Sequence, residues 1–119
     1  MALQSTLFSD DRALLACLIQ DRAHVTTGAL GEHVTKIHSA LVVLDNASID
    51  ITELRQGRYG PSTAAAVLAF KRKRNIINHS YQTQADNIVG KMTIAAMDRE
   101  ISIIEGHWAR EIHPTPAVA

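Results

Sequence analysis

Two stretches of this 119-residue chain, thirty residues apart, begin alike and constrain the fold more than any other feature. The first reads Gly60-Pro61-Ser62-Thr63-Ala64-Ala65-Ala66-Val67, and the second reads Gly90-Lys91-Met92-Thr93-Ile94-Ala95-Ala96-Met97. In the shared Gly-x-x-Thr, glycine is a helix N-cap without steric cost, and a threonine hydroxyl three residues on can reach exposed backbone amides. The repeat predicts two related helix starts, framed by Gly60, Thr63, Gly90 and Thr93, that pack on a common apolar centre.

Apolar residues recur at helical spacing through most of the chain, which predicts an all-α fold. Four helices are expected, over residues 10–24, 31–44, 61–74 and about 90–106. Ser9 is the expected N-cap of the first helix. Residues 45–57 predict a long loop or a short helical turn, and residues 75–87 predict a polar loop. Prolines at 114 and 116 predict an extended or mobile tail.

Three groups of residues carry a resemblance to a known family. The first group follows the pattern Gly-x-x-Val-x-x-Leu-Gln-x-x-Leu and comprises Gly31, Val34, Ile37 and Leu41. The second follows Asp-Gly-x-Tyr-Gly-x-x-Thr-x-x-Ala-Val-x-x-Phe-Gln and comprises Gly57, Tyr59, Gly60, Thr63, Ala66, Val67 and Phe70. The third, a closing element, follows Asp-Gly-Ile-Val-Gly-x-x-Thr-x-x-Ala-Leu and comprises Asp86, Ile88, Val89, Gly90, Thr93 and Ala96, with Met97 at the last apolar position. With these patterns, residues 30–101 resemble the peptidoglycan-binding-like domain, a three-helix fold.

The chain departs from the family pattern at several positions. His38 and Lys71 stand where the family usually has glutamine, and Asn87 replaces a turn glycine. Both loops are longer than is usual in the family, and the first expected helix has no counterpart in it.

The resemblance implies a small orthogonal helical bundle, with a peptidoglycan-binding-like three-helix core and an extra N-terminal helix. We expect an N-terminal helical extension over residues 1–29, the peptidoglycan-binding-like domain over 30–105 and a tail over 106–119. The implied function is non-catalytic binding of peptidoglycan, through its glycan or its stem peptide. The main alternative is a protein-interaction or structural component of a phage-like or secretion-related assembly, because one fold serves many functions.

The expected ligand-binding residues lie before the third helix and in the loop after it. They are Arg55, Arg58, Tyr59 and Tyr81. Arginine can grip a stem-peptide carboxylate with two hydrogen bonds, and tyrosine offers an apolar face with a hydroxyl. The resemblance also makes Tyr59 partly a core position, which competes with ligand contact.

Charge composition indicates no nucleic-acid partner, because twelve basic residues balance twelve acidic ones. The basic run 71–74 predicts a solvated helix end, since four consecutive helical positions point to all sides. No apolar run is long enough to span a membrane. Asp10, Asp11 and Arg12 precede the first apolar run, so no signal peptide is expected. We therefore expect synthesis in the cytoplasm, with a signal-independent route to the wall left open.

The histidine and cysteine patterns do not predict an enzyme, a metal site or a cofactor. His33 and His38 are five residues apart, about 140° around a helix, and a His-Glu-x-x-His motif is missing. Cys17 lies in an apolar run typical of a buried thiol. A wall hydrolase remains the third interpretation, because paired carboxylates can converge from distant positions.

Overall fold

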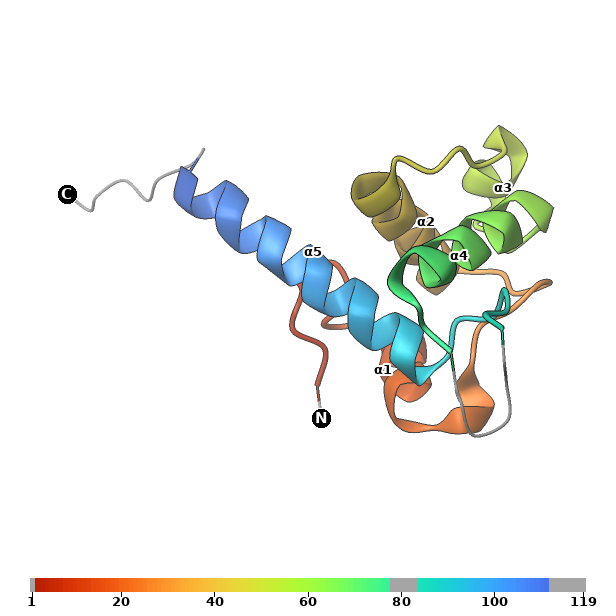
Figure 1. Ribbon diagram of the computed structural model, residues 1–119, viewed down its shortest axis with the longest axis horizontal. Coiled ribbons are helices and arrows are strands. Elements are labelled where there is room, and N and C mark those ends of the chain that lie inside the picture. The colour runs from red at the N-terminus through yellow and green to blue at the C-terminus, as the bar shows by residue number, and fades with distance from the viewer. Residues whose placement is uncertain (1, 78–83, 112–119) are drawn as a thin grey trace.

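The regular elements of the chain are helices (Figure 1). The structure is a computed structural model that describes residues 2–77 and 84–111. In chain order the elements are α1 (Arg12–Ile19), the 3-10 turn η1 (Asp21–Ala23), α2 (Glu32–Asp45), α3 (Ile51–Gln56), α4 (Pro61–Arg74) and α5 (Lys91–Glu111). No strand occurs within the described ranges, where β-type pairing consists of two isolated bridges. The all-α prediction is confirmed.

Glycines mark the starts of the three longest helices. Gly31 and Gly60 are the N-caps of α2 and α4, and α5 begins directly after Gly90. Gly31 has a φ of 135°, a value that favours glycine over any residue with a side chain. Pro61 occupies the first turn of α4, where its missing N–H would have had no helical partner. The predicted starts near Gly31, Gly60 and Gly90 are confirmed.

The first helix differs from the prediction at both ends. Its N-cap is Asp11, not Ser9, because the buried Asp11 carboxylate accepts a hydrogen bond from the Leu14 amide at 3.0 Å. The Ser9 amide instead donates to the Ser5 carbonyl in the preceding turn. The helix ends at Ile19, well before His24, because the backbone turns extended at Gln20. In residues 45–57, the short helical turn is the alternative that occurs, as α3.

One segment, residues 25–31, joins the two repeated helix starts. Val25 and Val89 exchange backbone hydrogen bonds of 2.8 Å just before α5. Just before α4, the Tyr59 amide donates to the Ala29 carbonyl, and the Tyr59 carbonyl accepts from the Gly28 amide, both at 2.9 Å. Tyr59 and Val89 are both fully buried. The starts of α4 and α5 therefore both pair with residues 25–31, and both bury a side chain in the same core.

That core draws on the N-terminal segment, on helices α1, α2, α4 and α5, and on the segments that lead into α4 and α5. α1 packs on α5, and α2 packs on α4 and α5. The largest fully buried apolar side chains are Phe8, Leu14, Ile37, Leu41, Tyr59, Phe70, Ile94 and Met97. Residues before and after Leu30 thus bury their apolar side chains in the same cluster.

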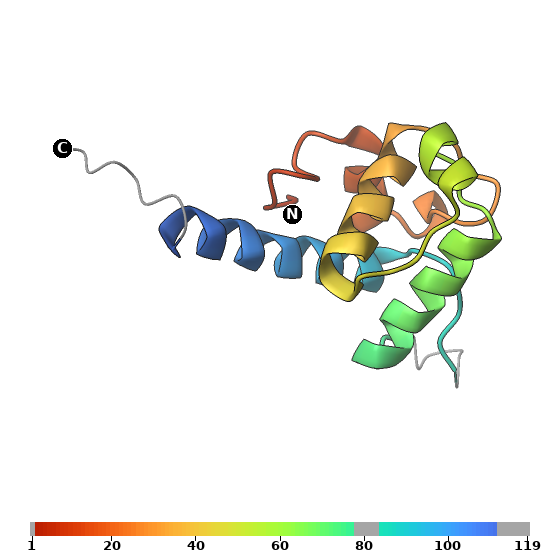
Figure 2. The same ribbon diagram turned by 90° about the horizontal axis from the view of Figure 1, so that it is seen from above.

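Residues 2–8 form a segment that runs beside α5 (Figures 1 and 2), and we call it the N-terminal strap. The Asp98 carboxylate of α5 accepts the amides of Gln4 and Ser5, each at 2.8 Å. Two turns further along α5, Glu105 accepts the amides of residues 6 and 7 at 2.8 and 3.1 Å. Four backbone donors of the strap are thereby satisfied by two helix carboxylates.

Helix α5 continues past the expected stop and projects from the rest of the molecule (Figures 1 and 2). The prediction that it ends near Gly106 is wrong, because the helix extends to Glu111. A glycine inside a helix costs only about 1 kcal/mol relative to alanine, which a long helix tolerates. Residues 112–119, the predicted tail, lie outside the described residues.

The prediction of a solvated end for α4 is wrong for two of its four basic residues. Lys71 is buried, and its ammonium group donates to the Asp86 carboxylate and, at 2.8 Å, to the Ile88 carbonyl. The burial is possible because both partners come from the segment that leads into α5. Lys71 therefore ties α4 to that segment.

Arg74 joins three helices. Its guanidinium pairs with Glu100 of α5 through contacts of 2.6 and 2.7 Å, and with Asp45 of α2 at 2.9 and 3.1 Å. It also stacks on the Phe70 ring, 3.6 Å from the ring centroid. These contacts raise the pKa of Arg74, the Glu100 hydrogen bonds most of all. The end of α4 is consequently a junction inside the protein.

Candidate functional site

Two of the expected ligand-binding residues, Arg55 and Arg58, lie at the turn between α3 and α4. Arg55 is exposed in the last turn of α3, and Arg58 is half-buried just after it. Between them the chain reverses at Gly57, whose φ is 60°. A Cβ at this position would lie 3.0 Å from the Gly31 carbonyl oxygen, so glycine is required by both conformation and space. Arg55 and Arg58 therefore lie on the two sides of one tight turn.

An exposed leucine lies opposite Arg58. Leu30 and Arg58 form an isolated antiparallel bridge, and Leu30 is 61% exposed. The Arg58 guanidinium donates to the Gln56 side-chain oxygen at 3.2 Å. We call Leu30, Arg55, Gln56 and Arg58 the α3 corner. It combines cationic donors for a carboxylate with an apolar side chain for a methyl or alkyl group.

The two expected tyrosines are not part of this described surface. Tyr59 is fully buried, and its hydroxyl donates to the Asn87 carbonyl. Burial raises the pKa of Tyr59, and the charge of Asp86 adds to the effect. The ring therefore joins the two loops and presents no surface to a ligand. Tyr81 lies outside the described residues.

A buried carboxylate directly beneath the corner holds the start of α4. Glu53 of α3 accepts hydrogen bonds from the amides of Gly60, Ser62 and Thr63 at 2.9–3.0 Å, and from the Thr63 hydroxyl at 2.7 Å. Burial alone would raise the pKa of Glu53, but the bonds from Thr63 and Ser62 outweigh it and lower the pKa from 4.5 to about 2. Glu53 is therefore ionised at neutral pH and caps the helix that follows its own.

The role of Glu53 was not predicted from the sequence, although a signal exists. Asp50-Ile51-Thr52-Glu53 has the spacing of a capping box, in which the acid at the third helical position returns to its own N-cap amide. Here Asp50 does cap α3, accepting from the Thr52 amide at 3.1 Å, while Glu53 reaches across to α4. Thr63, which was expected to contact exposed amides, donates its hydroxyl to Glu53 instead.

His38 of α2 completes this group from the opposite side. Its Nε2 lies 2.7 Å from the Thr63 hydroxyl oxygen, and 2% of the residue is exposed. The Thr63 hydroxyl has one proton, which the ionised Glu53 accepts, so Nε2 must carry the hydrogen that His38 donates to Thr63. Nδ1 is therefore the bare nitrogen, and it has no hydrogen-bond partner among the described residues. We call Glu53, Thr63 and His38 the buried relay.

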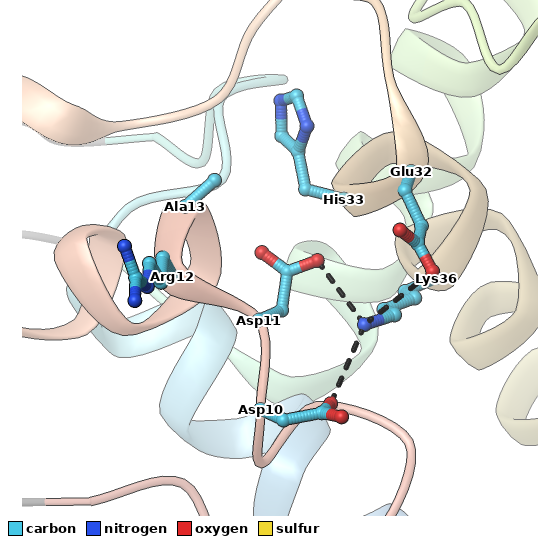
Figure 3. Close-up of a pocket in the computed structure, with 7 residues that line it drawn as sticks. All are labelled: Asp10, Asp11, Arg12, Ala13, Glu32, His33 and Lys36. Atoms are coloured by element: carbon cyan, nitrogen blue, oxygen red, sulfur yellow. Dashed lines mark ion pairs between the residues drawn. The ribbon is translucent and has the colours of Figure 1, made fainter.

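An open cleft of about 370 Å³ lies between the starts of α1 and α2 (Figure 3). At its centre Lys36 pairs with Asp11 at 3.2 Å, Asp10 at 3.6 Å and Glu32 at 4.0 Å. Burial opposes the charge on Lys36, but Asp11 and then the other carboxylates outweigh it and raise its pKa. Lys36 is therefore held in its charged form, and its ion pairs join the start of α1 to α2.

The described residues place no group of three or more His, Cys, Asp or Glu where a metal ion could be held. Cys17 is buried, and its thiol donates to the Val89 carbonyl at 3.3 Å. Burial raises the pKa of Cys17 to about 11, which disfavours the thiolate that nucleophilic chemistry requires.

Comparison with known proteins adds no relative, because no protein-family model, curated protein or solved structure matches the chain. None of the helices in the described ranges is long and apolar enough to cross a membrane.

Proposed function

We propose that this protein is a non-catalytic module that binds peptidoglycan through the α3 corner. In this proposal α2, α4 and α5 are the orthogonal three-helix core of a peptidoglycan-binding-like fold, and α1 is an addition to it. The observation that carries the proposal is the corner itself, where Arg55 and Arg58 flank the Gly57 turn, the exposed Leu30 pairs with Arg58, and buried hydrogen bonds support the turn. A rigid support of this kind favours binding, because little ordering is left to occur on association.

The chemistry of the corner fits a stem peptide better than a glycan strand. Stem peptides offer carboxylates beside small apolar side chains, which arginine and leucine can bind together. A glycan is usually bound by exposed aromatic rings, and Tyr59 of the expected ligand-binding residues is buried. The stem peptide is therefore the ligand that we propose.

Sedimentation with purified peptidoglycan sacculi tests this function. We expect the wild-type protein to pellet with sacculi and a soluble stem peptide to release it more effectively than glycan fragments. The double variant Arg55→Gln, Arg58→Gln should bind at least about tenfold more weakly, because each charge-assisted bond contributes about 1.5–3 kcal/mol. Arg72→Gln, which removes an exposed cation on α4, is the matched control. A wild-type protein that stays entirely in the supernatant refutes peptidoglycan binding.

Zymography on sacculi separates binding from hydrolysis. A non-catalytic module leaves the embedded peptidoglycan intact at every protein concentration. A zone of clearing would establish the wall-hydrolase interpretation instead.

A protein-binding or structural role in a phage-like or secretion-related assembly is the second candidate function. It is favoured by the projecting part of α5, where Ile103 and Ile104 are 63% and 41% exposed. Exposed apolar side chains on a projecting helix are typical of interaction surfaces. A protein complex that survives co-purification in the presence of wall fragments would support this role. Ile103→Asp should abolish that complex, and sacculus binding of the same variant is tested in parallel.

A further inference from the structure

Residues of the buried relay contact the backbone of Arg58, so a change in the relay can alter the position of Arg58 in the α3 corner. Arg58 follows Glu53 and precedes Thr63, and its amide donates to the Glu53 carbonyl at 3.0 Å. The Arg58 carbonyl favours protonation of the His38 ring and so raises its pKa. The same carbonyl oxygen lies 3.4 Å from the Thr63 hydroxyl oxygen. A change in the relay therefore reaches the backbone of Arg58 directly.

Burial of His38 favours the neutral form of the ring over the protonated form. The second proton must go to Nδ1, because Nε2 already carries one, and Nδ1 is buried without an acceptor in the described part of the chain. A buried N–H without an acceptor is costly, so the protonated ring gains by leaving the site.

The groups that face the ring come from each neighbouring element. Glu53 of α3 is the charged group that acts on His38, and it favours protonation. The Arg58 carbonyl favours protonation too, while the Thr63 hydroxyl of α4 accepts from Nε2. Burial is nevertheless the largest influence, and the pKa of His38 lies below its ordinary value of 6.5. Glu53 keeps its charge throughout mild acid, so titration between pH 7.5 and 5 changes the charge of His38 but not that of Glu53.

We propose that His38 and Glu53 are positioning residues, and that protonation of His38 opens the relay, frees the first turn of α4 and loosens the α3 corner. The effect on ligand affinity rests on the proposed function of that corner, whereas the opening itself does not. The expected size of the opening follows from linkage. In the opened state His38 has its ordinary pKa of 6.5. Lowering the pH from 7.5 to 5 then raises the population of the opened state relative to the closed state by at most about 30-fold.

Amide hydrogen exchange in the full chain tests the opening without any ligand. We expect the protection factors of the Ser62 and Thr63 amides, corrected for intrinsic exchange, to fall by up to about 30-fold from pH 7.5 to 5. In His38→Gln they should change by less than about twofold, because the glutamine amide can donate where Nε2–H donates but does not titrate. His33→Gln, on the same helix, should behave as wild type. Protection that falls equally in wild type and His38→Gln overturns the proposal.

Two further measurements keep the test decisive. If His38→Gln does not fold, an NMR titration of the wild-type imidazole decides, because coupling requires the amide signals of Arg58 and Thr63 to shift with the His38 pKa. Signals that stay constant through that titration overturn the proposal. Sacculus binding is then measured at both pH values, and a loss in acid that His38→Gln suppresses supports the link to the ligand. Binding that is absent at every pH refutes the proposed function, while the exchange data still decide the relay.

Discussion

The contribution of Glu53 to stability provides the sharpest test of the reasoning, and Glu53→Gln is the perturbation. The substitution keeps the shape of the side chain but removes its charge. It also replaces one acceptor oxygen by an NH₂ group, which would face the backbone donors at the start of α4. The amides that now bind two carboxylate oxygens would share one.

The magnitude follows from the pKa of Glu53. Its fall from 4.5 in an ordinary setting to about 2 in the folded protein corresponds to roughly 3 kcal/mol of stability at neutral pH. An independent figure agrees, because a buried donor left without an acceptor costs about 1–3 kcal/mol. We therefore expect Glu53→Gln to lower the free energy of unfolding by about 3 kcal/mol, and Tm by roughly 10–15 °C.

The pH dependence has a definite sign. A carboxylate with a depressed pKa stabilises the folded state above its unfolded pKa, and this stability is lost as the pH falls from 4.5 toward 2. The difference between wild type and Glu53→Gln should therefore be largest above about pH 5 and shrink to under about 1 kcal/mol near pH 2.5.

Urea unfolding followed by circular dichroism, at several values of pH, measures both quantities. Glu32→Gln is the control, because this carboxylate is 82% exposed and its ion pair with Lys36 spans 4.0 Å. It should change stability by less than about 0.5 kcal/mol. A loss in Glu53→Gln as small as that of the control, or one that is constant between pH 2.5 and 7, would refute the assigned role of Glu53.

Three further predictions concern other parts of the fold. Arg74→Lys should destabilise the protein by about 1–2 kcal/mol in urea unfolding, because an ammonium cannot pair bidentately with both Asp45 and Glu100; an unchanged midpoint contradicts the junction. Cys17 should react with an aromatic disulfide reagent at pH 8 at least about 100-fold more slowly in the folded than in the unfolded protein, and comparable rates would show that its thiol is accessible. Asp98→Asn should speed hydrogen exchange at the two strap amides that donate to Asp98 and lower the free energy of unfolding by about 1–2 kcal/mol. Unchanged exchange would mean that other contacts hold the strap.

Much of the helical frame was predictable, because it depends on interactions between residues close in the chain. Gly31, Gly60 and Pro61 define helix starts through backbone conformation and missing donors, which are local properties. Apolar spacing of three and four residues likewise marks the buried face of α2 before any partner is known. A local pattern could not place the end of α5, because a glycine such as Gly106 costs only about 1 kcal/mol inside a long helix.

The candidate site was predictable in part. Arg55 and Arg58 lie on the described surface, while Tyr59 is in the core because its hydroxyl finds the carbonyl of Asn87, twenty-eight residues further along. The position of that partner depends on how two loops meet, which no local pattern encodes. The same is true of Lys71, a cation expected in solvent, which is buried because Asp86 lies beside it in the folded chain.

The positions of the helices and of their apolar faces follow from backbone preference and periodicity within a few residues, so they can be derived from the sequence. Which polar groups are buried together depends instead on how the helices pack. Glu53, Thr63 and His38 come from three different helices, and their contacts exist because those helices pack at one place. Burial makes those contacts strong, because a charge or a donor removed from water must find its partner inside the protein.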